Sequence, residues 1–231
     1  MITFGTYSDQ GLRDSQQDAH HVTFNRDTGQ WAAALADGFG PETDVAEAAQ
    51  EAATTAAIKA IPYDPYVALG EAATRLHRDY DGDCVMVVAS QYTPNDAIDV
   101  AWVGDCRAYT WVGGELTQLT RDHNEAQELL DAGAPDEFAR KRRNVVTTSV
   151  ARSFESEYGT RSAAAPELVL LTTDGVHDVL GSDEITEVVR RFDTDPEVCA
   201  QALVEAARET DAGRPEAERS GDNATAVVLR L

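Results

Sequence analysis

Short apolar runs separated by polar turns follow one another along the whole chain, and most of them are too short to form helices. A continuous run such as residues 84–89 is typical of a strand covered on both faces, whereas the alternation in residues 20–24 is typical of a strand with one exposed face. The pair Gly113-Gly114 predicts a tight hairpin turn between two such runs. The pattern predicts strands at residues 2–7, 20–24, 31–37, 84–89, 97–103, 107–112, 115–119, 166–173 and 224–231.

Apolar positions spaced three and four residues apart predict helices early and late in the chain. The first helix begins near Asp44, where Glu47 three residues later suggests a capping box, and it ends at Pro62. The second begins at Asp64-Pro65, a capping residue followed by proline in the first turn. Further helices are predicted at residues 125–130, 183–192 and 196–208, and residues 134–143 are predicted to be a polar, basic and mobile surface segment.

The order of these elements predicts a layered fold. Each helix of the early pair and of the late pair has one apolar face, which must cover a sheet. Two stacked, mostly antiparallel sheets with a helix pair on each outer side would bury all of these faces, and strand ends would then meet at one end of the molecule. No internal repeat or linker interrupts the pattern, so residues 1–231 are predicted to be a single domain.

Acidic residues stand at one end of several predicted strands. Asp37, Asp105 and Asp174 close apolar runs, and Asp222 opens the last one. A single Asp-Gly pair is most often only a turn. Converging carboxylates would repel one another without cations, so the recurrence predicts a cluster of divalent metal ions held by oxygen ligands. The glycine after Asp37 lets the backbone turn sharply, and the carbonyl of this residue, Gly38, would be a further ligand.

The charge and the cysteines narrow the possible functions and compartments. A net charge of −22 and a pI near 4.4 argue against nucleic acid or an anionic membrane as a partner. Cys84, Cys106 and Cys199 are widely spaced, form no metal-binding pattern and suit a reducing compartment. The sequence shows no signal segment and no apolar run as long as a membrane span. We therefore expect a cytoplasmic protein, and we expect it to be a monomer.

Several segments, taken in order, resemble a known family. The chain resembles the metal-dependent serine/threonine protein phosphatases of type 2C, the PPM family, and its bacterial members most closely. The resemblance extends from Gly11 to Leu229 and rests on the segments GLRDSQQDAH, LADGFG, VAWVGDCRAYTW, LTQLTRDHN, LLTTDGVHDVL and GDNATAVVL. It implies an α+β fold of four layers, an αββα sandwich, which agrees with the layers expected from the pattern.

The resemblance implies a role for each matching residue of the metal cluster. Asp37 matches the acid that bridges two core metal ions, and Gly38 matches the residue whose backbone carbonyl is a ligand. Asp174 and Asp222 match the other carboxylates of the core ions. Asp105 matches the acid that, together with Asp174, holds a third and weaker ion in bacterial members.

The resemblance also implies a phosphate-binding residue and shows differences from the family pattern. Arg13 matches the arginine that grips the substrate phosphate, and Asp18 matches an acid close to the metals that acts through water. Gln17 replaces a carboxylate near the second metal, and Phe39 stands where some members carry a histidine proposed as the acid for the leaving group. Other departures from the family pattern are Pro41, Gly82-Asp83-Cys84 and Cys106.

The implied activity is hydrolysis of phosphoserine and phosphothreonine in proteins by a metal-activated water, with Arg13, Asp37 and Asp174 as catalytic residues. All-oxygen ligands favour Mn²⁺ or Mg²⁺ over zinc. The partners would be phosphorylated proteins, and the enzyme would oppose a Ser/Thr kinase. The basic segment 134–150 resembles the family's variable flap and would select substrates. Two alternatives stay open: an inactive or weak relative that binds phosphoproteins as a regulator, and a two-metal phosphatase for small phosphoesters.

Overall fold

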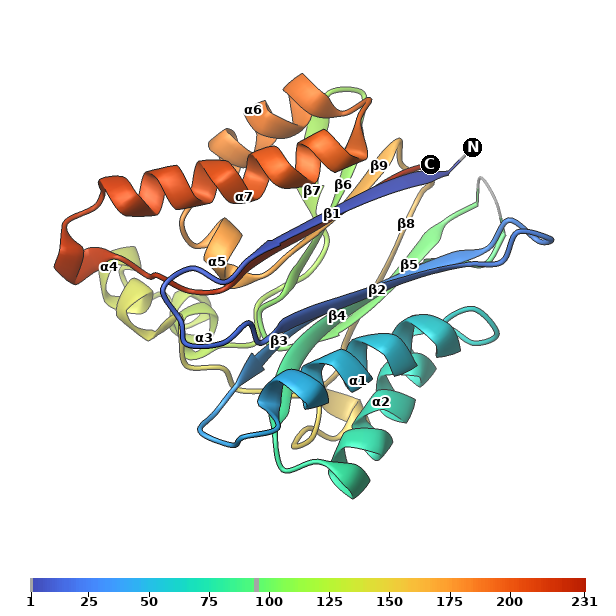
Figure 1. The fold of residues 1–231 in the computed structure, drawn as a ribbon, viewed down its shortest axis with the longest axis horizontal. Coiled ribbons are helices and arrows are strands. Elements are labelled where there is room, and N and C mark those ends of the chain that lie inside the picture. The colour runs from blue at the N-terminus through green and yellow to red at the C-terminus, as the bar shows by residue number, and fades with distance from the viewer. Residues whose placement is uncertain (1, 94–95) are drawn as a thin grey trace.

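The computed structural model describes residues 2–93 and 96–231, and its strands form two stacked sheets (Figure 1). Neighbouring strands pair antiparallel in both sheets. The first sheet contains, in spatial order, β1 (Thr3–Asp9), β10 (Ala224–Arg230), β9 (Leu168–Thr172), β6 (Arg107–Val112) and β7 (Glu115–Gln118). The second contains β2 (Asp18–Phe24), β3 (Trp31–Phe39), β4 (Asp83–Gln91), β5 (Ile98–Val103) and β8 (Gly159–Ala163).

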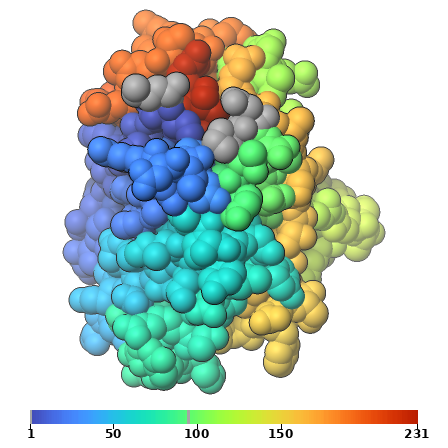
Figure 2. Space-filling view, turned by 90° about the vertical axis from the view of Figure 1, so that its right-hand side faces the viewer, coloured from blue at the N-terminus to red at the C-terminus, as the bar shows by residue number. Residues whose placement is uncertain are grey.

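A pair of helices covers the outer face of each sheet, which confirms the predicted α+β sandwich of four layers. The helices α1 (Val45–Lys59) and α2 (Pro65–Asp79) lie on the second sheet, and α7 (Pro196–Gly213) lies on the first, with α6 (Ser182–Phe192) beside it. In Figure 2, the residues of α1 and α2 (cyan and teal) and those of the late helices (orange) lie at opposite ends of one face. Among the described residues, no helix has both the length and the apolar character needed to cross a membrane.

Shorter helical segments lie in the connections between these elements. They are α3 (Glu125–Asp131), α4 (Asp136–Ala139), α5 (Asp174–His177) and the 3₁₀ turns Arg140–Arg142, Glu155–Glu157 and Glu216–Glu218.

The central strands are buried on both faces, as their continuous apolar runs predict. In β3, Ala34 and Ala36 pack into the layer beneath α1 and α2, whereas Leu35 packs into the layer between the two sheets. A third apolar layer lies under α6 and α7. This double burial fixes the register of β3, because a slip by one residue would exchange its two faces. The acid at the end of the strand is therefore held at a defined place.

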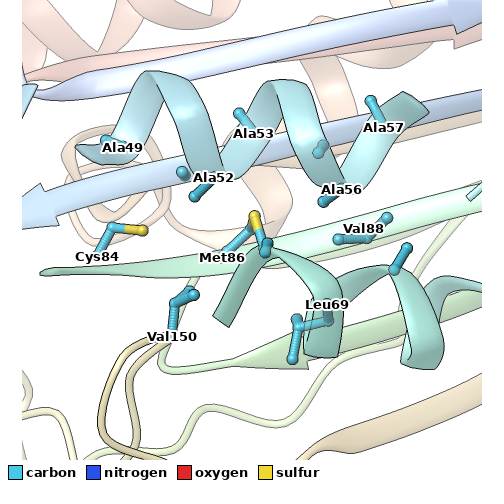
Figure 3. Packing of buried hydrophobic residues seen from close by; sticks show 14 of the residues in the cluster. Ala49, Ala52, Ala53, Ala56, Ala57, Leu69, Cys84, Met86, Val88 and Val150 are labelled. Carbon is cyan, nitrogen blue, oxygen red and sulfur yellow. The ribbon is translucent and has the colours of Figure 1, made fainter. Parts of the chain in front are cut away.

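Helix α1 presents small side chains to its sheet. Ala49, Ala52 and Ala56 are fully buried and lie toward Met86 and Val88 of β4 (Figure 3). Because the distance between packed elements depends on the side chains at the contact, alanine lets the helix lie close to the strands. The start of α1 is thereby brought next to the end of β3, where Gly38 lies against Val45.

Three features of the local structure differ from the sequence prediction. The edge strand β8 is not predicted, because its sequence GTRSA is polar and leaves three residues exposed. The surface segment 134–143 contains α4 and a 3₁₀ turn, neither of which was predicted. The late helix α7 continues to Gly213, beyond the end predicted at residue 208.

Two predictions about turns and caps were also wrong. The side chain of Asp44 does not cap α1; its carboxylate instead accepts hydrogen bonds from the backbone of Asp81 (3.0 Å) and Gly82 (2.9 Å). It therefore ties the start of α1 to the start of β4. Gly38 does not turn the chain, because β3 continues to Phe39 and the positive φ of 119° is found at Gly40.

Candidate metal centre

Ends of strands from both sheets meet at one edge of the sandwich and bring the predicted acids together. Asp18 and Asp37 lie opposite each other in the β2–β3 ladder. Asp174 begins α5 directly after β9, Asp222 lies just before β10, and Asp105 lies between β5 and β6. The other four carboxylates are close enough to Asp37 for each of them to raise the pKa of Asp37. These five residues are called the aspartate cluster below.

Asp18 joins the two sheets at this edge. Its Oδ2 atom accepts hydrogen bonds from the hydroxyls of Thr173 (2.9 Å) and Thr225 (2.7 Å), which belong to the β9 and β10 side of the sandwich. Both threonines are fully buried. Neither threonine was predicted from the sequence, although both lie within three residues of a cluster acid. Their contact shows that Asp18 is fixed by hydroxyl groups of the opposite sheet.

Two glycines permit the close approach of backbone segments at the cluster. A Cβ atom on Gly175 would lie 1.9 Å from the carbonyl oxygen of Asn223, so no side chain fits between α5 and the start of β10. A Cβ atom on Gly38 would lie 2.9 Å from the carbonyl oxygen of Gln17. The glycines that follow Asp37 and Asp174 therefore serve close packing and not turns, and they keep the two acids near each other.

Burial and mutual repulsion both raise the pKa values of the carboxylates in the cluster. Burial raises the pKa of Asp37 and of Asp174 well above its usual range, and the charges of the neighbouring aspartates raise it further. Burial and the charge of Asp222 raise the pKa of Asp18 to about 7, although its two hydroxyl partners oppose the shift. The cluster thus has an excess of negative charge that protons or cations must offset.

Asp105 has its own surroundings within the cluster. It is buried, and its Oδ2 atom accepts one hydrogen bond, of 3.3 Å, from the side chain of Asn124. Burial and the charges of Asp122 and Asp178 raise the pKa of Asp105 to about 7. The charge of Asp105 in turn raises the pKa of Asp174, so Asp105 interacts both with the cluster and with Asp122 and Asp178.

The carboxylate oxygens fit divalent cations. The Oδ1 atoms of Asp18 and Asp174 are buried and have no hydrogen-bond donor in the described structure. Buried polar atoms are almost always satisfied, and hard oxygen ligands of this kind suit Mg²⁺ or Mn²⁺. Within residues 2–93 and 96–231, no three Asp, Glu, His or Cys side chains are grouped tightly enough to hold an ion by themselves. An ion here would thus also need a backbone carbonyl, such as that of Gly38, and water.

Arg13 lies at the rim of the cluster. Its Nη2 atom is 2.7 Å from Oδ2 of Asp222, and its side chain is 55% exposed. Asn223 holds the loop that carries Arg13: its amide donates to the carbonyls of Gln10 (2.8 Å) and Ser15 (3.1 Å), and its Oδ1 atom accepts from the backbone of Gln17 (2.7 Å). This role of Asn223 was not predicted, although the residue stands within the segment GDNATAVVL.

Two histidines in the segments that follow β9 and β7 are engaged inside the protein. His177 is buried, and its Nδ1 atom lies 2.8 Å from the hydroxyl of Thr172. Burial lowers the pKa of His177 well below its usual range, so the ring is neutral near pH 7. His123 similarly lies 2.8 Å from the hydroxyl of Thr148. Phe39 offers no proton at its position.

Comparison with known proteins finds protein phosphatases as relatives of this chain. Over 253 residues the chain is 28% identical to the serine/threonine protein phosphatase PstP of Mycobacterium tuberculosis, and the match covers 99% of this chain and 45% of that protein. Over 100 residues it is 35% identical to the protein phosphatase PhpP of Streptococcus pneumoniae, covering 41% of this chain and 40% of that protein. The matched part is thus less than half of either relative. No family model matches the chain.

The fold agrees with these relatives. The crystal structure of the catalytic domain of PstP in complex with two manganese ions superposes with a TM-score of 0.77 at 22% identity, covering 99% of this chain and 97% of that domain. The architecture is that of the type 2C phosphatases. The sequence relatives are protein phosphatases of the kind that the motifs led us to expect, and the fold agrees with them.

Proposed function

We propose that the protein is a metal-dependent phosphoprotein phosphatase that hydrolyses phosphoserine and phosphothreonine. The observation that supports this most is the convergence of five aspartates from both sheets on one edge, next to an exposed arginine. Asp37, Asp174 and Asp222 would hold two divalent ions together with the carbonyl of Gly38. Bound Mn²⁺ or Mg²⁺ would supply an activated water as the nucleophile and would offset charge on the phosphoryl group.

The chain's own residues would bind and orient the substrate. The planar guanidinium of Arg13 can donate to two phosphoryl oxygens at once, and its exposure leaves it accessible to a phosphorylated side chain. The loop that carries Arg13 is held by Asn223, so the guanidinium approaches from a fixed side. Asp18, fixed by Thr173 and Thr225, would keep negative charge close to the ions and orient water.

Asp105 would hold a third, weaker ion together with Asp174. It lies between β5 and β6, and its charge raises the pKa of Asp174, so the two carboxylates act on each other. An ion held by fewer protein ligands binds less tightly, because water must fill its remaining positions. We infer that Asp105 helps to position water for proton delivery to the leaving oxygen, a task that Phe39 cannot perform.

The proposed substrates are phosphorylated proteins, and the enzyme would oppose a Ser/Thr kinase. The excess of acidic residues makes nucleic acid and anionic membranes poor partners. The three cysteines are buried and unbridged, which suits action in the reducing cytoplasm. We further propose that residues 1–231 act as one domain and as a monomer, because the apolar faces of the described helices and strands pack within the chain.

The test is the release of phosphate from a phosphothreonine peptide and from a small aryl phosphate, each with Mn²⁺ and with chelator. The proposal predicts metal-dependent release from the peptide, which Asp37→Asn abolishes and the exposed control Asp27→Asn does not. Asp27 lies in the turn between β2 and β3, at the far end of the hairpin. Turnover of the aryl phosphate alone would favour a small-molecule phosphatase. Metal-dependent binding of phosphopeptide without turnover would favour the regulatory alternative.

A further inference from the structure

Asp83 is a buried acid outside the aspartate cluster, and it anchors a segment beside the cluster. Asp83 begins β4, is 2% exposed and lies opposite Phe39 in the β3–β4 ladder. Its carboxylate accepts hydrogen bonds from the backbone of Cys84 (2.8 Å), the hydroxyl of Ser149 (2.6 Å) and the backbone of Ala151 (2.9 Å). A buried carboxylate with several donors is a strong anchor. It fixes the segment 149–153 at the same end of the sheet as Asp37.

The same segment is also held by the apolar core. Val150 is fully buried in the layer beneath α1, where it lies near Cys84 (Figure 3). Its backbone N–H donates to the carbonyl of Cys84 at 2.9 Å. The turn is closed by Ser149 and Ser153, since the backbone of each donates to an oxygen of the other, at 2.9 and 3.1 Å. The backbone that carries the next residue, Arg152, is therefore held in one position.

Arg152 extends from this anchored turn to the rim of the proposed active site. Its guanidinium carbon lies 5.9 Å from the centre of the Phe39 ring, and Phe39 stands two residues after Asp37 on β3. Two residues of an extended strand span about 7 Å. The side chain of Arg152 is 68% exposed. A positive charge is thus presented to solvent beside Phe39, on the strand that carries Asp37.

The contact between Arg152 and Asp83 leaves the guanidinium available. The closest approach is from Nε to Oδ2, at 3.4 Å. The partly buried pair Arg107–Asp122 is different, because Nε and Nη2 of the arginine both donate, at 2.9 and 2.5 Å. Asp83 is already satisfied by three shorter donors, so the anchor does not depend on Arg152. The terminal nitrogens of Arg152 can bind a carboxylate from another molecule.

We propose that Arg152 is a specificity-determining residue that binds an acidic side chain two or three residues away from the phosphorylated residue of a substrate. The inference rests on the proposed phosphatase function. With a net charge of −22, the protein repels an acidic peptide at long range. A cation held at the rim offsets that repulsion locally and selects acid-flanked sites. The aromatic ring of Phe39 supports the guanidinium from below and excludes water on one side.

The test compares phosphothreonine peptides that differ only in having Glu or Gln at the flanking positions. The parent should turn over the Glu peptide with the higher kcat/KM. Arg152→Ala should lower kcat/KM for the Glu peptide by about fivefold, the scale of one exposed ion pair, and leave the Gln peptide unchanged. Arg152→Glu should reverse the preference toward a Lys-flanked peptide. The difference between peptides should shrink at high salt, because exposed charges are screened.

Two controls separate this role from a structural one and from the proposed function. Arg26→Ala changes an exposed arginine in the β2–β3 turn, about 20 Å along the hairpin from Asp37. This variant should leave kcat/KM unchanged for both peptides. Turnover of a small aryl phosphate should be the same in the parent and in Arg152→Ala. Equal losses on both peptides and on the aryl phosphate would overturn the proposal in favour of a purely structural Arg152, and so would an absence of any peptide preference in the parent.

Failure of the proposed function has a different signature. If the parent hydrolyses no substrate, peptide binding measured by fluorescence anisotropy decides the role of Arg152 by itself. Tighter binding of the Glu peptide that is lost in Arg152→Ala supports the inference. Equal binding of the Glu and Gln peptides overturns it.

Discussion

The guanidinium of Arg13 lies against the carboxylate of Asp222, with 2.7 Å between Nη2 and Oδ2. The two residues are 209 positions apart in sequence, and they meet because β1 and β10 are neighbours in the first sheet. Among the described residues, Arg13 is the only cation that forms an ion pair with the aspartate cluster, and it does so at the rim of the cluster. A phosphoryl group that binds at this rim can therefore contact the arginine and the cluster at the same time.

Replacing Arg13 should weaken substrate binding more than turnover. Arg13→Ala should raise the Michaelis constant for a phosphopeptide by roughly 10- to 100-fold, because a charge-assisted hydrogen bond contributes about 1.5–3 kcal/mol. Arg13→Lys should restore only part of the loss, since an ammonium group cannot donate to two oxygens from one plane. Steady-state kinetics with Arg26→Ala as the control checks this. Parent-like kinetics in Arg13→Ala would show that the arginine does not bind phosphate.

Metal should stabilise the fold, and the effect should grow with pH. The pKa values of Asp18 and Asp105 are about 7 in the folded protein, above the usual 3.8. Without metal, these groups favour the folded state at low pH, and the contribution is lost as the pH rises from about 4 through about 7. The expected slope is about 1.4 kcal/mol per pH unit for each proton involved.

Divalent ions compete with these protons, so Mn²⁺ should raise the melting temperature more at pH 7.5 than at pH 5. The measurement is thermal unfolding with Mn²⁺ and with chelator at both pH values. Asp18→Asn should reduce the pH dependence of the metal effect, whereas the exposed Asp27→Asn should leave it unchanged. A melting temperature that does not respond to metal at either pH would contradict a metal centre.

A substitution at Asp105 can distinguish a third ion from the two core ions. Asp105→Ala should leave two ions bound and the fold intact, because Asp37, Asp174 and Asp222 remain. It should lower turnover of a phosphopeptide by about 10²–10³, the scale of removing one preorganised electrostatic group. The loss should be smaller on an aryl phosphate, whose leaving group needs less protonation. Calorimetric metal titration beside both assays decides the matter, and full activity or loss of all metal binding would each refute the third-ion role.

The flap segment can be shortened at a place that the structure defines. Residues 145–147 are tied to the start of α3, since Glu125 donates to Val145 (2.9 Å) and Thr147 donates to His123 (2.8 Å). Residues 134–142, with α4 and its 3₁₀ turn, project beyond these bonds. Replacing residues 134–142 by a short Gly/Ser linker should change the preference among phosphopeptides and keep aryl phosphate turnover nearly intact. Equal losses on both substrate types would indicate a structural role for the segment.

Gly175 offers a test of the packing at the cluster. Gly175→Ala would place a Cβ atom 1.9 Å from the carbonyl of Asn223, and backbone would have to move. We expect a loss of stability of about 1–3 kcal/mol, the usual range for overpacking, and a lower metal affinity because Asp174 is displaced. Gly213→Ala is the control, since nothing lies within 4 Å of its added Cβ. Chemical denaturation of both variants measures the difference, and equal stabilities would contradict the close contact.

The alanine face of α1 should tolerate little increase in size. Ala52→Leu adds a branched side chain where the helix and β4 are in close contact, so it should destabilise the fold by about 1–3 kcal/mol. Ala46→Leu, on the partly buried side of the same helix, is the matched control. The measurement is the free energy of unfolding, and similar values for both variants would show that the interface can expand.

The sequence predicted the architecture well where burial leaves a regular pattern. Strand β4 could be recognised because residues 84–89 form a continuous apolar run, and α2 because Asp64 and Pro65 mark its start. Asp64 does accept the expected cap bond from Val67 at 2.9 Å. The edge strand β8 could not be predicted, because its pairing with β5 depends on backbone bonds and not on apolar side chains.

The site was predictable in part for a related reason. Carboxylates at strand ends are visible as a recurring local pattern, so Asp37, Asp105 and Asp174 could be found from sequence. The partners that fix them are not visible in this way. Thr225 binds Asp18 across 207 positions, and Asn223 holds the Arg13 loop through backbone carbonyls. Contacts of this kind follow from how the two sheets meet, which no local pattern contains.

The pairing of β1 with β10 has a practical consequence for how the molecule can be handled. Thr3 lies opposite Arg230 at one end of this ladder, and Asp9 lies opposite Ala224 at the other, about 20 Å away. The two chain ends are therefore neighbours, on the side remote from the aspartates. If the protein were attached to a bead or sensor chip through either chain end, the aspartate edge would face the solution. Joining the ends through a short linker would give a circular chain that can be reopened at the exposed turn of residues 26–28, with both sheets still complete.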